Sequence, residues 1–307
     1  MPATMSNAQT DLSTLVQQDW TCLSPPLLHR LATCEIPLAE WMAASQRLKQ
    51  SPLLVGVNGP QGSGKSTTCA CLQVILQHYF GLRVAVVSID DFYLTKAQRI
   101  QQGQTIHPLL VTRGVPGTHD IPLAIDTLMA LQAAHGSQSV AVPRFNKAID
   151  DRYPAKDWTP IVTPVDVILF EGWCVGAKPE PESSLSNPIN RLEREEDADT
   201  KWRQHVNSAL ADSYQALFGL LDKLVLFEYG DFSWVFQWRQ QQERENAAKA
   251  KDNNISGIMD DAALERFILH YERVTRNCQQ MLPKTADVCI HLTKEREVTS
   301  LTWKPAI

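Results

Sequence analysis

Short apolar runs rich in β-branched residues alternate along this chain with longer segments of helical periodicity. The runs are Leu53–Val57, the inner parts of Leu82–Tyr93 and Val165–Trp173, and the segments DKLVLFEYG and ADVCIHL. Uninterrupted apolar runs of this length are typical of strands buried on both faces, as in parallel sheets. Strands that alternate with helices predict an α/β fold, a three-layer sandwich with a mostly parallel central sheet.

The helical segments divide the chain into unequal parts. Apolar residues recur at helical intervals from Trp202 to Leu217 and again from Leu264 to Met281, and we expect both stripes to lie in the core. Residues 1–50 look helical and carry no recognisable chemistry, which predicts an N-terminal helical extension before a domain spanning residues 51–307. The segment AKPEPESSLSNPINRLEREEDADT predicts an exposed loop that leads into a helix, within a lid or insert at about residues 176–255.

The composition is ordinary for a soluble globular protein. A chain of 307 residues can bury a large core, and its net charge of −5 gives no electrostatic reason to expect nucleic acid or an anionic membrane as partner. The N-terminus has no signal-peptide pattern, and no apolar run approaches the roughly 20 residues of a membrane span, so we expect a cytoplasmic protein. The seven cysteines form neither CxxC pairs nor a zinc spacing and are expected to be reduced. The sequence carries no signal of oligomeric state.

The stretch LLVGVNGPQGSGKSTT, Leu53–Thr68, carries the clearest chemistry. It fits GxxxxGK(S/T) between a predicted strand and an apolar helix that ends at Gly81. Such a loop directs backbone N–H groups and the positive end of a helix at a polyphosphate. We predict that Lys65 reaches the β- and γ-phosphates of ATP and that the Ser66 hydroxyl binds Mg²⁺. The predicted nucleotide-binding residues are Gly59, Pro60, Gln61, Gly62, Ser63, Gly64, Lys65, Ser66 and Thr67.

A P-loop occurs in kinases, GTPases, ATPases and assembly factors alike. The residues at the ends of the other predicted strands must therefore indicate which class of nucleotide-binding protein this is. The N/TKxD motif of GTPases is absent, since NKAID at Asn146 has its acid one residue too late. Glu171, after the apolar residues of VDVILFEGW, is the candidate second Mg²⁺ ligand, with loop capping as the alternative. Asp90 and Asp91 end another predicted strand, and Asp90 is the candidate acceptor of a substrate hydroxyl proton. A turn or N-cap role is the alternative for both aspartates.

Two loops bring cations into an otherwise acidic protein. TRGVPGTHD and PRFNKAIDDRYP suit a small anionic substrate or the ATP phosphates, and the alternative is that each is a solvated loop. Arg239 is a candidate mobile arginine for the transferring phosphoryl group, or a surface charge, and it follows Trp234 and Trp238, which we expect to pack. Arg273 and Arg276 are expected on a solvated helix face. The candidate substrate-binding residues are Arg113, His119, Asp120, Arg144, Lys147 and Arg152.

The P-loop, DDFY and EGW together resemble the phosphoribulokinase and uridine kinase branch of P-loop kinases. RGVPGTHD, PRFNKAIDDR, NRLEREED, WRQHVN, WRQQQE and FILHYERVTR resemble the D-glycerate 3-kinase family more specifically, over about Leu53–Trp303. This resemblance implies that Asp90 is the catalytic base and Glu171 a metal ligand, in agreement with the reasoning from the residues. One departure concerns the acceptor, because Asn146-Lys147-Ala148 stands where the family pattern has Asp-Lys-Ser or Asp-Lys-Ala.

The resemblance implies an activity as well. It implies transfer of phosphate from ATP, with Mg²⁺, to the terminal hydroxyl of D-glycerate, and Lys65, Asp90 and Arg239 are the expected catalytic residues. A kinase of the same branch that acts on pantothenate or a nucleoside is the alternative enzyme, although the GTHD and NKAIDDR loops offer charge rather than an aromatic slot for a base. A non-catalytic ATP-binding regulator is the alternative from another class, and it predicts no acceptor-dependent ADP release.

Overall fold

The computed structural model describes residues 24–133, 136–251 and 261–305, and its centre is a six-stranded sheet with the strand order β10-β9-β8-β1-β7-β2. All neighbouring strands are parallel except the antiparallel pair of β9 and β10. The mostly parallel sheet is therefore confirmed, and each predicted apolar run contributes a strand. The strands are β1 (Leu53–Asn58), β2 (Val84–Ser88), β7 (Val167–Gly172), β8 (Lys223–Tyr229), β9 (Val288–Leu292) and β10 (Val298–Trp303).

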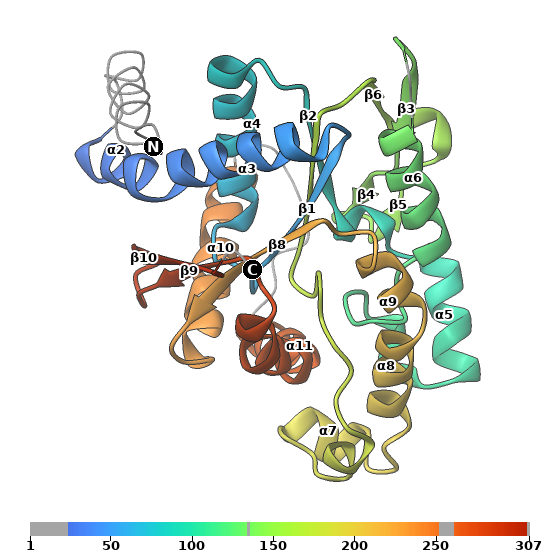
Figure 1. Cartoon of the computed structure of the whole chain (residues 1–307). Coiled ribbons are helices and arrows are strands. Elements are labelled where there is room, and N and C mark those ends of the chain that lie inside the picture. Colours follow the sequence, from blue (N-terminus) through green and yellow to red (C-terminus); the bar gives the residue numbers. More distant parts are fainter. Residues whose placement is uncertain (1–23, 134–135, 252–260, 306–307) are drawn as a thin grey trace.

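Helices cover both faces of the sheet, which confirms the three-layer sandwich (Figure 1). Side chains alternate between the faces along each strand, so that Leu169 of β7 packs in one core cluster and Phe170 in the other. The first face is covered by α3 (Ile36–Lys49) and α4 (Lys65–Phe80), with α10 (Ser233–Lys251) at its edge. The second face is covered by α6 (Ile121–Ala133), α8 (Lys201–Ala211), α9 (Ser213–Phe218) and α11 (Asp261–Met281).

Smaller elements surround this frame. The N-terminal extension is helical from residue 25, and the part of that prediction that falls on residues 1–23 lies outside the described residues. Two small antiparallel sheets pair β3 with β6 and β4 with β5, and β4 and β5 form a hairpin within the connection from β3 to β6. The remaining helices and strands are α2 (Pro25–Arg30), the π-helical turn Leu31–Glu35, α5 (Lys96–Thr105), α7 (Arg191–Glu196), β3 (Ser139–Val142), β4 (Phe145–Asn146), β5 (Asp151–Arg152) and β6 (Thr159–Val162). The 3₁₀ turns are η2 (Ile89–Phe92), η3 (Pro108–Val111), η4 (Ala155–Asp157), η5 (Glu182–Ser186) and η6 (Leu282–Lys284).

One helix of the second half differs from expectation. The helix predicted from Trp202 to Leu217 is interrupted at Asp212, where φ is −108° and ψ is −101°, so it forms α8 and α9. Leu217 is nevertheless buried, because the second helix directs its apolar face into the same core. The range of residues 176–255, in which a lid or insert is expected, also contains β8, the strand predicted from DKLVLFEYG.

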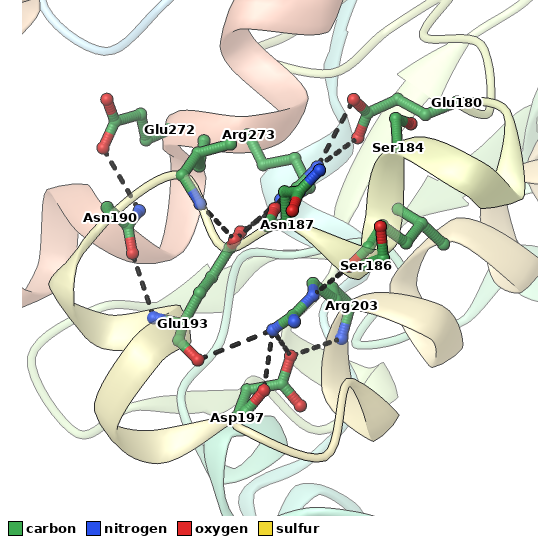
Figure 2. Close-up of polar contacts among 12 residues, drawn as sticks. Glu180, Ser184, Ser186, Asn187, Asn190, Glu193, Asp197, Arg203, Glu272 and Arg273 are labelled. Atoms are coloured by element: carbon green, nitrogen blue, oxygen red, sulfur yellow. Dashed lines mark hydrogen bonds and ion pairs between the residues drawn. The ribbon is translucent and has the colours of Figure 1, made fainter.

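The charged segment predicted as an exposed loop is anchored to α8 and α11 by a buried network of ion pairs (Figure 2). Arg273 of α11 pairs with Glu193 at 2.7 Å and with Glu180 at 3.2 Å, and Arg203 of α8 pairs with Asp197 at 2.8 Å. Glu193 and Asp197 are 0% exposed, which is tolerable only because each carboxylate is paired with a guanidinium. The expectation of a solvated Arg273 was therefore wrong, whereas most residues of the segment itself are exposed.

The opposite outcome holds for Arg276, which is exposed as expected and pairs along α11 with Glu272 at 2.8 Å. The six cysteines in the part of the chain that the structure describes form no disulfide. Within the same residues, every helix is too short or too polar to cross a lipid bilayer.

Candidate active site

The P-loop connects the end of β1 to the start of α4. Gly62 and Gly64 have φ of +77° and +92°, a left-handed region that favours glycine. A Cβ on Gly62 would lie 2.8 Å from the Cβ of Trp238, so this tryptophan packs against the loop, as the sequence predicted. The Asn58 side chain donates hydrogen bonds to the carbonyls of Trp173 and Val175, at 3.3 and 2.8 Å, and thereby ties the loop to the end of β7.

The two predicted magnesium ligands lie in contact. The strand register sets Glu171 of β7 beside Val57 on one side and Ser88 on the other, at the carboxyl edge of the sheet. The Ser66 hydroxyl donates to Oε1 of Glu171 at 3.0 Å, and Nζ of Lys65 lies 3.8 Å from Oε2. That Oε2 is buried and accepts no hydrogen bond in the described structure. A hydroxyl and a carboxylate with a free oxygen are ligands of the type that Mg²⁺ prefers, so these residues fit the ion.

Exchange of Glu171 for glutamine tests this assignment. We expect Glu171→Gln to fold and to need roughly tenfold or more Mg²⁺ for half-maximal velocity, because a neutral amide is a poorer ligand for a hard cation. The measurement is the initial velocity titrated with Mg²⁺ at saturating ATP. Glu180→Gln, which alters an acid of the distant network in Figure 2, is the matched control and should leave the midpoint unchanged. A wild-type midpoint in Glu171→Gln would contradict the assignment.

Asp90 lies in η2, one turn beyond the end of β2. Its carboxylate accepts a hydrogen bond from Nζ of Lys147 at 2.7 Å and another from the Tyr93 hydroxyl at 2.8 Å. Burial by itself would raise the pKa of Asp90, but Lys147, the nearby Lys65 and the Tyr93 hydroxyl hold this pKa below its usual range. Asp90 is therefore ionised at neutral pH and faces the lysine of the P-loop.

Asp91 has different partners. It accepts hydrogen bonds from Nη1 of Arg144 at 2.6 Å and from the backbone N–H of Phe145 at 3.0 Å. Burial raises the pKa of Asp91. The two carboxylates thus diverge as expected, although they do so in a 3₁₀ turn rather than on an extended strand, and Asp91 fixes the start of the β4–β5 hairpin.

This hairpin carries Lys147 at its turn. The side-chain oxygen of Asn146 accepts a hydrogen bond from the backbone N–H of Ala148 at 3.0 Å and so holds the turn. An aspartate would offer the same acceptor atom, which explains how asparagine serves at this departure from the family pattern. The hairpin sets the Lys147 ammonium beside Asp90, while the lysine side chain remains 62% exposed.

Two further cations approach the same region. Arg113 pairs with Asp150, and its backbone carbonyl accepts a hydrogen bond from the Tyr271 hydroxyl at 2.9 Å. Asp90 raises the pKa of Lys147, and the positive charges of Arg113 and Arg239 oppose this rise. Lys147, Arg113 and Arg239 therefore lie close enough to influence one another, and each is paired with an acid, namely Asp90, Asp150 and Glu243.

Arg239, on α10, is held by its own helix. Its guanidinium pairs with Glu243, donates to Gln242 at 2.7 Å and lies 5.3 Å from the centre of the Phe267 ring. Its Nε is buried and has no hydrogen-bond partner among the described residues. Arg239 therefore retains a free donor among the described residues. A residue that changes partners when phosphate binds would need such a donor.

The other candidate residues stabilise the surrounding loops. Arg144 is engaged by Asp91, and Arg152 pairs with Asp120 at 3.0 Å. Asp120 also accepts a hydrogen bond from the N–H of Leu123, in the first turn of α6, at 3.3 Å. The structure thus brings Lys147 to Asp90 and leaves Arg113, Arg144, Arg152 and Asp120 in ion pairs that fix the loops, with Arg113 near enough to act on Lys147.

His119 is buried beneath the site. Its ring stacks on Tyr93 with centroids 4.5 Å apart, and its Nδ1 lies 2.5 Å from the Tyr214 hydroxyl. Burial lowers the pKa of His119 to about 4, against a smaller opposing effect of Asp90, so the imidazole is neutral at pH 7. A neutral, stacked imidazole supports the position of Tyr93 and adds no positive charge for an anion.

The sequence reasoning missed two tyrosines. Tyr93 donates to Asp90, and a spacing of three residues was the available signal, because residues three apart share one side of a helical turn. Tyr271 was assigned to an apolar stripe, yet its hydroxyl reaches the loop of Arg113. Periodicity identified the buried face of that helix but gave no information on which group the tyrosine hydroxyl would contact.

Comparison with known proteins identifies relatives over most of the chain. The uncharacterized kinase mug58 of Schizosaccharomyces pombe is 33% identical over 235 residues, which cover 72% of this chain and 78% of that protein. The chloroplastic D-glycerate 3-kinase of Arabidopsis thaliana is 30% identical over 278 residues, which cover 85% of this chain and 57% of that protein's length. The structure of D-glycerate 3-kinase from Cryptococcus neoformans var. grubii superposes with a TM-score of 0.73 and 27% identity, over 88% of this chain and 99% of that one. No protein-family model matches the chain.

The fold, the P-loop and these relatives define an ATP-dependent kinase of the P-loop class. Such kinases act on small molecules and typically use Mg²⁺, in keeping with the contact between Ser66 and Glu171. Within this class, the chain belongs to the kinase family that includes mug58 and D-glycerate 3-kinase.

Proposed function

We propose that this kinase transfers the γ-phosphoryl group of ATP to the terminal hydroxyl of D-glycerate, giving 3-phospho-D-glycerate. The observation that carries the proposal is Asp90, an ionised carboxylate that is paired with Lys147 and also feels the charge of Lys65 of the P-loop, with Arg113 near enough to act on Lys147. A base beside the γ-phosphate, with positive charge beyond it, suits an alcohol that also bears a carboxylate. The relatives named D-glycerate 3-kinase support glycerate as that alcohol.

Asp90 acts on the attacking hydroxyl. It accepts the hydrogen bond of the hydroxyl and takes its proton as the new O–P bond forms, while the bond to the bridging oxygen breaks and its electron pair leaves with ADP. A depressed pKa suits late proton transfer in a loose transition state, where orientation of the nucleophile contributes most. Lys65 holds the β- and γ-phosphates, and Arg239 meets the charge that develops on the transferring group. Magnesium held by Ser66 and Glu171 would offset phosphate charge.

Lys147 links acceptor binding to this step. In the structure its ammonium is paired with Asp90, and its exposed side chain is free to exchange that partner for the carboxylate of an incoming acceptor. When Lys147 moves to the acceptor, Asp90 loses the cation that lowers its pKa most, so its basicity rises. Binding of the acceptor carboxylate would thus raise the basicity of Asp90, which takes the proton from the hydroxyl of the same acceptor.

Exchange of Lys147 for methionine tests the acceptor clamp. We expect Lys147→Met to raise the KM for D-glycerate about 10- to 100-fold, the usual cost of one charged hydrogen bond, and to leave the KM for ATP unchanged. Lys156→Met, which alters an exposed lysine on the turn after the hairpin, is the matched control and should change neither constant. Equal increases in the KM for D-glycerate and the KM for ATP in Lys147→Met would indicate that this loop binds the nucleotide rather than the acceptor.

A coupled ADP-release assay across D-glycerate, pantothenate, uridine and ribulose 5-phosphate tests the substrate. We expect D-glycerate to give the highest kcat/KM of the four, because only it has a primary hydroxyl and a carboxylate close enough together to contact the neighbouring Asp90 and Lys147 at the same time. A higher value with pantothenate or uridine would favour the alternative kinases. ADP release that no acceptor stimulates would favour a regulator.

A further inference from the structure

Arg99, on α5, is the largest side chain that the described structure buries completely, at 1% exposure. A guanidinium in such a place is costly unless its donors are satisfied. Its Nε donates to the carbonyl of Leu94 at 3.2 Å, its Nη1 to that of Val111 at 2.7 Å, and its Nη2 to that of Asp150 at 2.6 Å. Nη2 also lies 3.1 Å from the Asp150 carboxylate.

These three carbonyls belong to the three segments that form the acceptor side of the site. Leu94 directly follows Tyr93 in the segment of Asp90, and Val111 lies two residues before Arg113. Asp150 lies in the turn that carries Lys147. A planar guanidinium with donors in fixed directions can hold three chain segments at set positions, which a lysine ammonium cannot do.

Asp150 extends this arrangement to a side chain of the site. Its φ is +57°, and its carboxylate pairs with Arg99 and with Arg113. Both guanidinium groups also lie over the Phe145 ring, at 5.9 and 5.5 Å from its centre. Arg113 is therefore held through a residue that Arg99 itself fixes. None of these contacts reaches the P-loop.

We propose that Arg99 is a positioning residue that assembles the acceptor half of the active site. It sets the spacing of Asp90, Arg113 and Lys147, and so determines affinity for the anionic acceptor without touching it. The inference rests on the proposed function for the identity of the acceptor, and its test begins with wild-type turnover of D-glycerate, so that a failure of the function is seen separately.

Arg99→Lys is the main variant. We expect its KM for D-glycerate to rise roughly tenfold or more, because lysine cannot satisfy the carbonyls of three segments at once, and its KM for ATP to stay at the wild-type value. Arg203→Lys is the matched control, since Arg203 is 2% exposed and also binds backbone carbonyls and one carboxylate, within the network of Figure 2. We expect both variants to lower the melting temperature, and only Arg99→Lys to change the KM for the acceptor.

Asp150→Asn keeps the proposal testable if Arg99→Lys does not fold. Asparagine tolerates the positive φ and keeps the carbonyl that Arg99 binds, while it removes the charge that Arg99 and Arg113 share. The side chain of Asp150 is 34% exposed, so we expect a folded protein with a raised KM for D-glycerate and an unchanged KM for ATP. Three results would overturn the proposal. The first is an unchanged KM for D-glycerate in Asp150→Asn, and the second is an equal change of both KM values in Arg99→Lys. The third is the same rise of the KM for D-glycerate in Arg203→Lys.

Discussion

Asp90→Asn lowers kcat by about 10²- to 10⁴-fold, the typical contribution of a general base, and leaves ATP affinity unchanged. Asparagine keeps the shape of the side chain and one acceptor oxygen but cannot take the hydroxyl proton. ATP affinity persists because the P-loop and its contacts to β7 are unaltered. The measurements are kcat at saturating substrates and equilibrium titration of a non-hydrolysable ATP analogue.

Asp91→Asn provides the adjacent control. Asp91 binds Arg144 and the N–H of Phe145, and asparagine still accepts from that N–H, so we expect a smaller loss of kcat and some loss of stability. A severe loss of kcat in Asp91→Asn together with near-normal turnover in Asp90→Asn would show that the base is the second aspartate.

Lys65→Ala lowers turnover on the order of 10²-fold or more, because it removes the charge that offsets the β- and γ-phosphates as they gain negative charge. In the structure its ammonium lies 3.8 Å from Glu171 and lowers the pKa of Asp90, so it is close to both the proposed metal ligands and the proposed base. Turnover and ATP affinity are measured together, and we expect both to fall.

Lys49→Ala is a suitable control for Lys65. Lys49 also pairs with an acid, Asp222, but it does so at the amino end of β1, where Asp222 accepts a hydrogen bond from the N–H of Leu54. We expect a change in stability at most. Near wild-type turnover in Lys65→Ala would be incompatible with the P-loop assignment.

The sequence predicted the phosphate side of the site because its signals are local. The P-loop spacing, the glycines and the apolar runs that end in Glu171 and Asp90 each lie within one stretch of chain. Parallel strands end at the same edge of a sheet, so the meeting of these stretches also follows from fold class.

The acceptor side and the buried network were harder to predict because their partners are far apart in sequence. The sequence shows that Arg273 is charged and lies on the polar side of its helix. Its burial depends on Glu193, which lies 80 positions away. Similarly, the candidate cations could be identified from the sequence. Their ion pairs, Arg144 with Asp91 and Lys147 with Asp90, could not be predicted from it. The break at Asp212 left no signal in the periodicity, since the apolar spacing continues through it.

Proton-coupled ³¹P NMR of the reaction product tests the central claim most directly. The protein is incubated with D-glycerate, ATP and Mg²⁺, and the phosphate ester is observed without separation. The account predicts an acceptor-dependent ester whose signal is split by the methylene protons of the terminal carbon, as in 3-phospho-D-glycerate. An ester split by a single methine proton, or ADP formation without any glycerate ester, would contradict it.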